Sequence, residues 1–169
     1  GLKSRDQSKT FIYALIYGAG DQKLGAVVGG NKTDGKELRG RFFDNLPSFK
    51  ALRDRVARAS TKGYLKGLDG RKIYVRSEHA ALNTLLQGAG AIVMKEAMRI
   101  LNTKIKDQKL NAHFVCNVHD EWQIEAHQSV AEKIGQLGVQ SIKDAGFALS
   151  LRCPLTGEYN VGNNWAETH

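Results

Sequence analysis

Cysteine and proline are scarce in this chain of 169 residues, which holds two of each. Cys116 and Cys153 have no CxxC spacing, so neither a disulfide scaffold nor a thiolate zinc site organises the fold. We therefore predict a reducing, cytoplasmic environment. No apolar run approaches the roughly 20 residues of a membrane-spanning helix, and we expect no membrane partner. Hydrophobic residues at 41% and charged residues at 25% are typical of a globular domain and argue against disorder.

Acidic residues are in deficit, because 17 Asp and Glu stand against 25 Lys and Arg and leave a net charge of +8. Residues 50–76 hold nine basic and two acidic side chains, so most of the excess lies there. Such a stretch is either a solvated helix face or a surface that contacts nucleic-acid phosphates. The asymmetry favours the phosphate surface. Its basic residues are Lys50, Arg53, Arg55, Arg58, Lys62, Lys66, Arg71, Lys72 and Arg76.

The periodicity of the apolar residues predicts an α+β fold, with a helical part followed by an antiparallel sheet backed by long helices. Ser4 followed by Gln7 has the spacing of a capping box and is expected to begin the first helix. The hairpin is expected around Asp69-Gly70. The predicted helices are 4–17, 21–28, 33–46, 48–62, 79–106 and 128–145. The predicted strands are 64–68, 71–76, 112–118, 122–126 and 147–152.

Polar side chains repeat every four residues along the first predicted helix, as Arg5, Lys9, Tyr13 and Tyr17. This spacing places them on one face, over ~18 Å at 1.5 Å per residue. That length suits an extended nucleoside triphosphate, with its phosphates near the cations and its base near the aromatic rings. The alternative is an ordinary amphipathic helix with a polar surface.

The segment His119-Asp120-Glu121 lies between two predicted strands, at a tight turn. Neighbouring carboxylates at a turn are suited to a shared hard cation such as Mg²⁺, which serves phosphoryl-transfer chemistry. A polar hairpin tip without a function is the alternative interpretation.

A third polar cluster, His79, Asn83 and Gln87, repeats every four residues on the long predicted helix. Side chains of this kind reach acceptors in the grooves of a nucleic-acid duplex. A hydrophilic helix stripe would show the same spacing.

The three clusters together resemble family A (Pol I-like) DNA polymerases, in the branch that bacteriophages use for replication. Arg5 to Gly18 follow the pattern R-x3-K-x3-[YF]-x3-Y-G of the nucleotide-binding fingers helix. Residues 67–87 resemble a palm segment, VHDE at 118–121 resembles the carboxyl-side metal motif, and NWAETH at 164–169 resembles the ending of the family. The resemblance divides the chain into a fingers portion, 1–63, and a C-terminal palm portion, 64–169.

The resemblance also implies roles for the fingers helix. Arg5 and Lys9 would bind the triphosphate of the incoming dNTP, and Lys9 would also donate a proton to pyrophosphate as a catalytic residue. Tyr13 would lie beside the sugar and the β-phosphate. Tyr17 would occupy the position of the templating base until the helix closes.

For the palm, the resemblance makes Asp120 a catalytic metal ligand and Glu121 a weaker, supporting catalytic carboxylate. His119, together with His79, Asn83 and Gln87, would contact the primer-template DNA near its growing end.

The family holds two Mg²⁺ ions with a second aspartate, from a palm strand upstream of the fingers helix. Residues 1–169 contain neither that strand nor a thumb or exonuclease domain. We therefore expect a C-terminal piece of a DNA-directed DNA polymerase that is active only with an N-terminal fragment, in the host cytoplasm if a phage encodes it. Two alternatives stay open: a non-catalytic DNA-binding accessory subunit, and a metal-dependent phosphohydrolase that uses residues 119–121.

Overall fold

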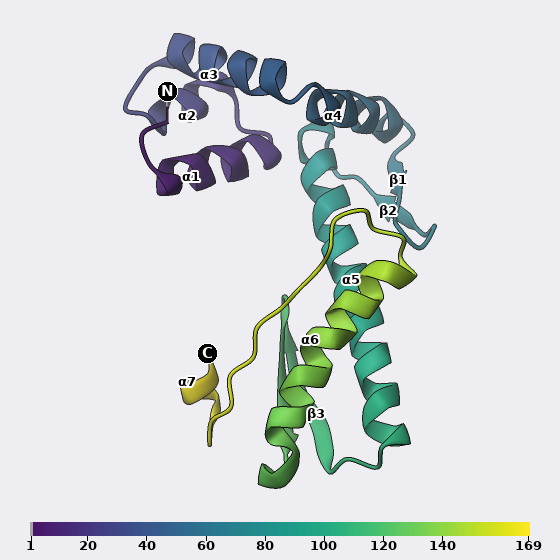
Figure 1. The fold of residues 1–169 in the computed structure, drawn as a ribbon. Helices are drawn as coiled ribbons and strands as arrows, with labels where there is room; N and C mark the ends of the chain where they lie inside the picture. Colours follow the sequence, from purple (N-terminus) through teal and green to yellow (C-terminus); the bar gives the residue numbers. More distant parts are fainter. Residues whose placement is uncertain (1) are drawn as a thin grey trace. The chain divides into compact units, whose positions relative to one another are not determined.

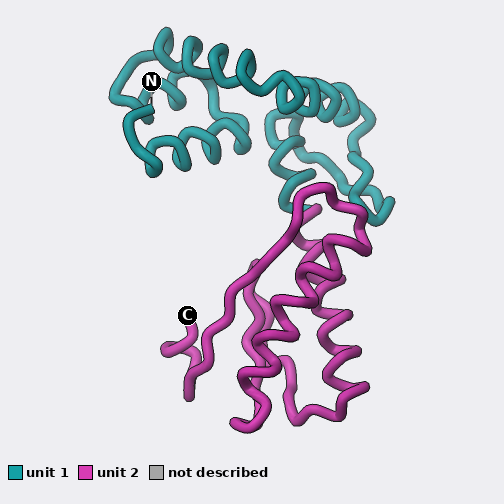
Figure 2. The backbone as a smooth tube through the Cα atoms, in the orientation of Figure 1, with its two compact units in different colours: residues 1–88 teal, residues 89–169 magenta. Residues whose placement is uncertain are grey.

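The computed structural model describes residues 2–169, which fall into two compact units, residues 2–88 and 89–169 (Figure 2). Helix α5 (Ala81–Asp107) begins in unit 1 and continues in unit 2. Among the residues described, no helix combines the length and the apolar character needed to cross a membrane.

Helix α1 (Arg5–Ile16) has well-formed ends. At its start, the Gln7 amide donates to the Ser4 hydroxyl at 3.1 Å, and the Gln7 side chain accepts from the Lys3 amide at 2.8 Å. At its end, the Gly18 and Ala19 amides donate to the carbonyls of residues 15 and 14, which is a Schellman motif. The structure therefore confirms the predicted capping at Ser4 and Gln7.

The other helices of unit 1 confirm the predicted order, with bounds within three residues of those expected. Asn31 and Asp34 form a reciprocal capping box at the start of α3. Phe11, Leu24 and Phe43 are buried together and form the core of the helical part. The helices are α2 (Asp21–Ala26), α3 (Lys32–Asn45) and α4 (Pro47–Ser60).

The predicted hairpin is present as β1 (Tyr64–Lys66) and β2 (Lys72–Tyr74), which pair antiparallel. Its loop contains Asp69-Gly70, as expected. Leu65 packs into a second core with Val56 and Leu82, so α4, the hairpin and the start of α5 are held together within unit 1. A short 3₁₀ turn, η1 (Glu78–Ala80), leads into α5.

In unit 2, β3 (Ala112–Val118) and β4 (Glu121–Ala126) form the second antiparallel pair (Figure 1). Leu101 of α5 and Ile134 of α6 are buried against the inward side chains of this pair, so the two helices back the sheet. The remaining elements are η2 (Gln128–Val130), α6 (Ala131–Ala148) and α7 (Trp165–Thr168). The predicted α+β architecture is confirmed, with the strands of residues 2–169 divided between two separate two-stranded sheets.

The strand predicted at 147–152 is wrong, because α6 continues through Phe147 to Ala148. Ser150 then adopts a φ of +55° and donates to the Phe147 carbonyl at 2.9 Å, while Leu151 donates to the Gly146 carbonyl at 2.9 Å. These bonds complete a helix ending in place of a strand. The side chain of Phe147 is left exposed.

Candidate functional site

Of the four ladder residues, Arg5, Lys9 and Tyr13 lie on the exposed face of α1, and Tyr17, the C-cap residue that follows the helix, is exposed as well. The Tyr13 and Tyr17 side chains are 52% and 56% exposed. The opposite face carries Phe11, which is buried in the core. The single polar face predicted from the spacing is therefore confirmed, and the assignment of these residues to the nucleotide stays a prediction.

The end of α1 meets the beginning of α5 within unit 1. Gln87 donates from Nε2 to the Tyr17 hydroxyl at 3.4 Å. Gly18 has a φ of +78°, and a Cβ placed on it would lie 2.4 Å from the His79 carbonyl oxygen, so only glycine fits at this contact. The structure thus brings together two clusters that lie about 60 to 70 residues apart in the sequence.

His79, expected on the long helix, lies in the 3₁₀ turn η1 that precedes it, whereas Asn83 and Gln87 lie on α5. The Asn83 side chain is less exposed than those of the other two. Its Oδ1 atom is buried and has no hydrogen-bond partner among residues 2–169. An unpaired buried amide oxygen is costly, so the position is suited to a polar ligand or an ordered water.

The His119-Asp120 pair forms a two-residue turn, because Val118 pairs directly with Glu121. His119 has a φ of +54°, the left-handed conformation that such hairpin turns require and that residues other than Gly, Asn and Asp seldom adopt. Asp120 is exposed at the turn. Within residues 2–169 its carboxylate forms no ion pair or side-chain hydrogen bond, so it is free for an external ligand.

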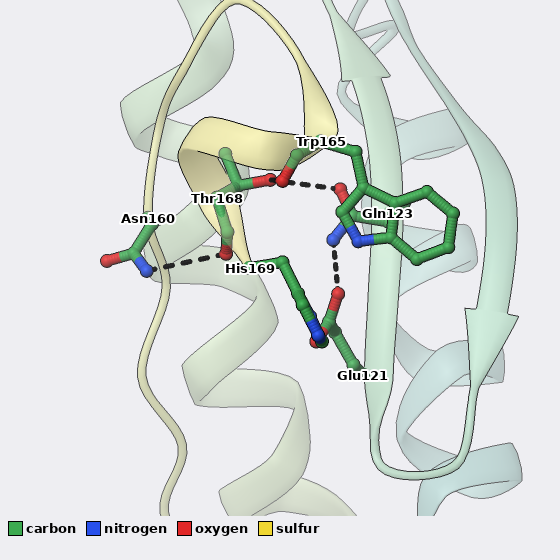
Figure 3. Close-up of polar contacts among 6 residues, drawn as sticks. All are labelled: Glu121, Gln123, Asn160, Trp165, Thr168 and His169. Atoms are coloured by element: carbon green, nitrogen blue, oxygen red, sulfur yellow. Dashed lines mark hydrogen bonds and ion pairs between the residues drawn. The ribbon is translucent and has the colours of Figure 1, made fainter.

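Glu121, the next residue, has a different environment (Figure 3). One carboxylate oxygen accepts a short hydrogen bond from Gln123, and the other lies 3.0 Å from Nδ1 of His169. The bond from Gln123, and then that from His169, hold the pKa of the Glu121 carboxyl below its ordinary value. Thr168 donates to Oε1 of Gln123 at 3.2 Å.

The sequence analysis did not assign a role to Gln123, Thr168 or His169. The ending NWAETH is part of the family resemblance, but no periodicity connects it with β4. Only the folded chain shows that His169 and Glu121, which are 48 residues apart, lie side by side.

The fit of a metal ion depends on Asp120. Oxygen donors suit Mg²⁺, and the free carboxylate of Asp120 is such a donor. Across residues 2–169, however, no three His, Cys, Asp or Glu side chains gather into a set that could hold a metal ion together. Asp120 thus fits as one ligand of a site that needs further ligands.

The basic stretch 50–76 contains side chains of two kinds. Arg53 forms an ion pair with Asp54 at 2.8 Å and lies 4.2 Å from the centroid of the Phe43 ring, so part of its role is packing. Arg55 and Arg58, on the same helix, are exposed. These two are the better candidates for phosphate contacts.

The architecture and the sequence both find counterparts among polymerases. A solved structure of the POL domain of Pol1 from M. smegmatis, in complex with DNA primer-template and dNTP, matches with a TM-score of 0.75 and 26% identity over 83% of this chain and 27% of that chain. The fold is therefore that of a polymerase fingers and palm fragment. A sequence model described as DNA polymerase family A matches residues 2–167.

Phage relatives are more similar in sequence. The DNA-directed DNA polymerase of Escherichia phage Phieco32 is 44% identical over 176 residues, covering 100% of this chain and 29% of that protein. The DNA-directed DNA polymerase of Escherichia phage T7 is 37% identical over 192 residues, covering 99% of this chain and 27% of that protein. This chain belongs to DNA polymerase family A, in its phage-type branch. It spans less than a third of the length of these two relatives.

Proposed function

We propose that this chain is the C-terminal part of a DNA-directed DNA polymerase, which binds incoming dNTP and primer-template DNA and supplies one catalytic aspartate. The observation that carries the proposal is the free, exposed carboxylate of Asp120 at a two-residue turn, in a chain whose family membership is established over residues 2–167. The reaction is templated transfer of a nucleotide to the 3′-hydroxyl of the primer.

Each part of the chain has a task in this proposal. On α1, Arg5 and Lys9 neutralise the triphosphate, Lys9 protonates the leaving pyrophosphate, and Tyr13 lies beside the sugar. Tyr17, next to Gln87, occupies the templating position in the open state. We propose a functional division in which residues 1–63 bind the nucleotide and residues 64–169 serve catalysis and contact the DNA.

On the palm side, Asp120 is the residue that would hold Mg²⁺. Bound Mg²⁺ would stabilise the charge that develops on the attacking and leaving oxygens. His119, His79, Asn83 and Gln87 contact the primer-template. Because residues 2–169 offer Asp120 but no complete ligand set, the second aspartate comes from an N-terminal polymerase segment that also carries the thumb.

Reconstitution tests this proposal. We expect no primer extension from the purified chain alone with Mg²⁺ and dNTPs, because one metal-binding aspartate cannot organise the reaction. Addition of a polypeptide that carries the upstream palm strand and the thumb should restore extension, whereas that polypeptide alone should stay inactive. Extension by the chain alone would contradict the need for a partner. DNA binding without extension in the mixture would favour the accessory-subunit alternative.

The basic helix α4 gives a second measurable expectation. DNA affinity of the reconstituted polymerase should fall with salt at a slope of about −0.9 per duplex phosphate neutralised. Replacing Arg55 and Arg58 by alanine should flatten the slope by up to about 0.9 for each phosphate that is no longer neutralised, as measured by fluorescence anisotropy at several salt concentrations.

The matched control removes two arginines that already have acidic partners. Arg41 is paired with Glu37 and Arg99 with Glu96. The Arg41→Ala/Arg99→Ala variant has the same change of net charge and should keep the slope of the unmodified protein. If DNA affinity had the same salt dependence in both double variants, α4 would be a solvated helix face and not a phosphate-binding surface.

A further inference from the structure

Residues 154–169, here called the strap, run back along α6 after its end (Figure 1). Near the end of α6, Leu155 packs on Gly146, where a Cβ would lie 3.2 Å from its Cγ atom. Near the beginning of α6, the ring of Tyr159 covers Gly135 so closely that a Cβ there would lie 2.1 Å from the ring. Contacts with α6 therefore fix the path of the strap at both ends of the helix.

The last part of the strap is ordered by its own hydrogen bonds. Asn164 caps α7 by accepting from the Glu167 amide at 3.2 Å, and its side-chain amide donates to Oε1 of Glu167 at 2.7 Å. The Asn163 amide donates to Oε2 of Glu167 at 2.7 Å. Thr168 and His169 are thereby presented to β4 by a folded segment.

Thr168 and His169 contact β4 directly beside the turn that carries Asp120. The strap reaches Gln123 through Thr168 and Glu121 through His169 (Figure 3). Both carboxylate oxygens of Glu121 are thus engaged, one by Gln123 and one by His169. Asp120, its neighbour in the sequence, has both oxygens free among residues 2–169.

We propose that His169 is a positioning residue for nucleotide transfer. By engaging Glu121, it keeps this carboxylate out of the metal-ligand set and leaves Asp120 as the one free carboxylate at the turn. The inference rests on the proposed polymerase function and assigns Glu121 to anchoring the strap. Removal of His169 would release one oxygen of Glu121, which would then compete with Asp120 for the cation.

A double-mutant cycle in the reconstituted polymerase tests this coupling. His169→Ala should lower the kcat of primer extension by about tenfold, because the released Glu121 carboxylate disturbs the cation held at Asp120, with the KM for dNTP nearly unchanged. Glu121→Ala removes the competing carboxylate itself, so adding His169→Ala to this variant should lower kcat no further. Because His169 acts through Glu121, the double variant should be no slower than the slower single variant.

Two further variants separate positioning from other roles of a histidine. His169→Asn keeps an N–H donor close to the place of Nδ1 and should recover most of kcat. His113→Ala removes an exposed histidine from β3 and should leave kcat unchanged. The inference would be overturned if the two single substitutions lowered kcat by independent factors that multiply in the double variant. It would also be overturned if His169→Ala kept full activity, or if His169→Asn were as slow as His169→Ala. If the unmodified reconstituted protein does not extend primers, the proposed function itself fails.

Discussion

Replacing Asp120 by alanine should abolish primer extension by the reconstituted polymerase while DNA binding stays nearly intact. Asp120 is exposed at the two-residue turn and has no partner among residues 2–169, so its removal leaves no unpaired group and the paired residues Val118 and Glu121 can stay in place. What disappears is the free carboxylate that would hold Mg²⁺. The effect should therefore fall on the chemical step rather than on the affinity for DNA.

The measurement is the single-turnover rate of dNTP incorporation at saturating DNA, beside the Kd for primer-template. Asp107→Ala removes an exposed carboxylate of the same type at the end of α5 and serves as the control. An Asp120→Ala rate above about a tenth of the unmodified rate would mean a barrier change under ~1.4 kcal/mol, too small for the removal of a metal ligand. A large decrease in DNA affinity would instead assign Asp120 to DNA contact.

A second large effect is expected at Tyr13. Phenylalanine at this position should leave dNTP incorporation roughly intact but select strongly against dideoxynucleotides. Tyr13 is 52% exposed, and within residues 2–169 its hydroxyl has no hydrogen-bond partner, so it is available to a nucleotide. A normal nucleotide can satisfy polar groups near the sugar with its 3′-hydroxyl. A dideoxynucleotide lacks that group, and the tyrosine hydroxyl can take its place.

The discriminating quantity is the ratio of kcat/KM for a dNTP to that for the matching ddNTP. The ratio should rise by orders of magnitude in Tyr13→Phe, because a site that leaves a polar group unpaired discriminates far more strongly than one that loses a methylene. Tyr74→Phe makes the same chemical change at an exposed tyrosine of β2 and should not alter the ratio. An unchanged ratio in Tyr13→Phe would mean that Tyr13 does not lie beside the sugar. It would also weaken the assignment of Arg5, Lys9 and Tyr17 to nucleotide binding.

The sequence predicted most elements of this fold because their signals are local. The cap at Ser4, the i+4 ladder on α1 and the Asp69-Gly70 turn each depend on a few neighbouring residues. The strand expected at 147–152 failed because a local alternation of apolar and polar residues competed with the continuing hydrogen bonds of α6. Residues 147–151 form the hydrogen bonds of a helix ending, and the side chain of Phe147 is left exposed to solvent.

The candidate site was predictable where single residues carry a motif and not where the chain folds back on itself. Asp120 and the ladder follow from spacing and family resemblance. The contact of His169 with Glu121 and that of Tyr17 with Gln87 join residues that are 48 and 70 positions apart. No periodicity encodes such pairs, because they depend on the path of the strap and on the packing of α1 with the start of α5.

The turn at His119 also links the correct pairing of β3 and β4 to the position of the carboxylate that we propose to be catalytic. In β4, Trp122, Ile124 and Ala126 alternate onto the side that packs against the core of unit 2. A shift of the pairing by one residue would move Asp120 out of its place in the turn, and would at the same time turn these three side chains toward solvent. A molecule with a misplaced aspartate is therefore also one with an exposed core.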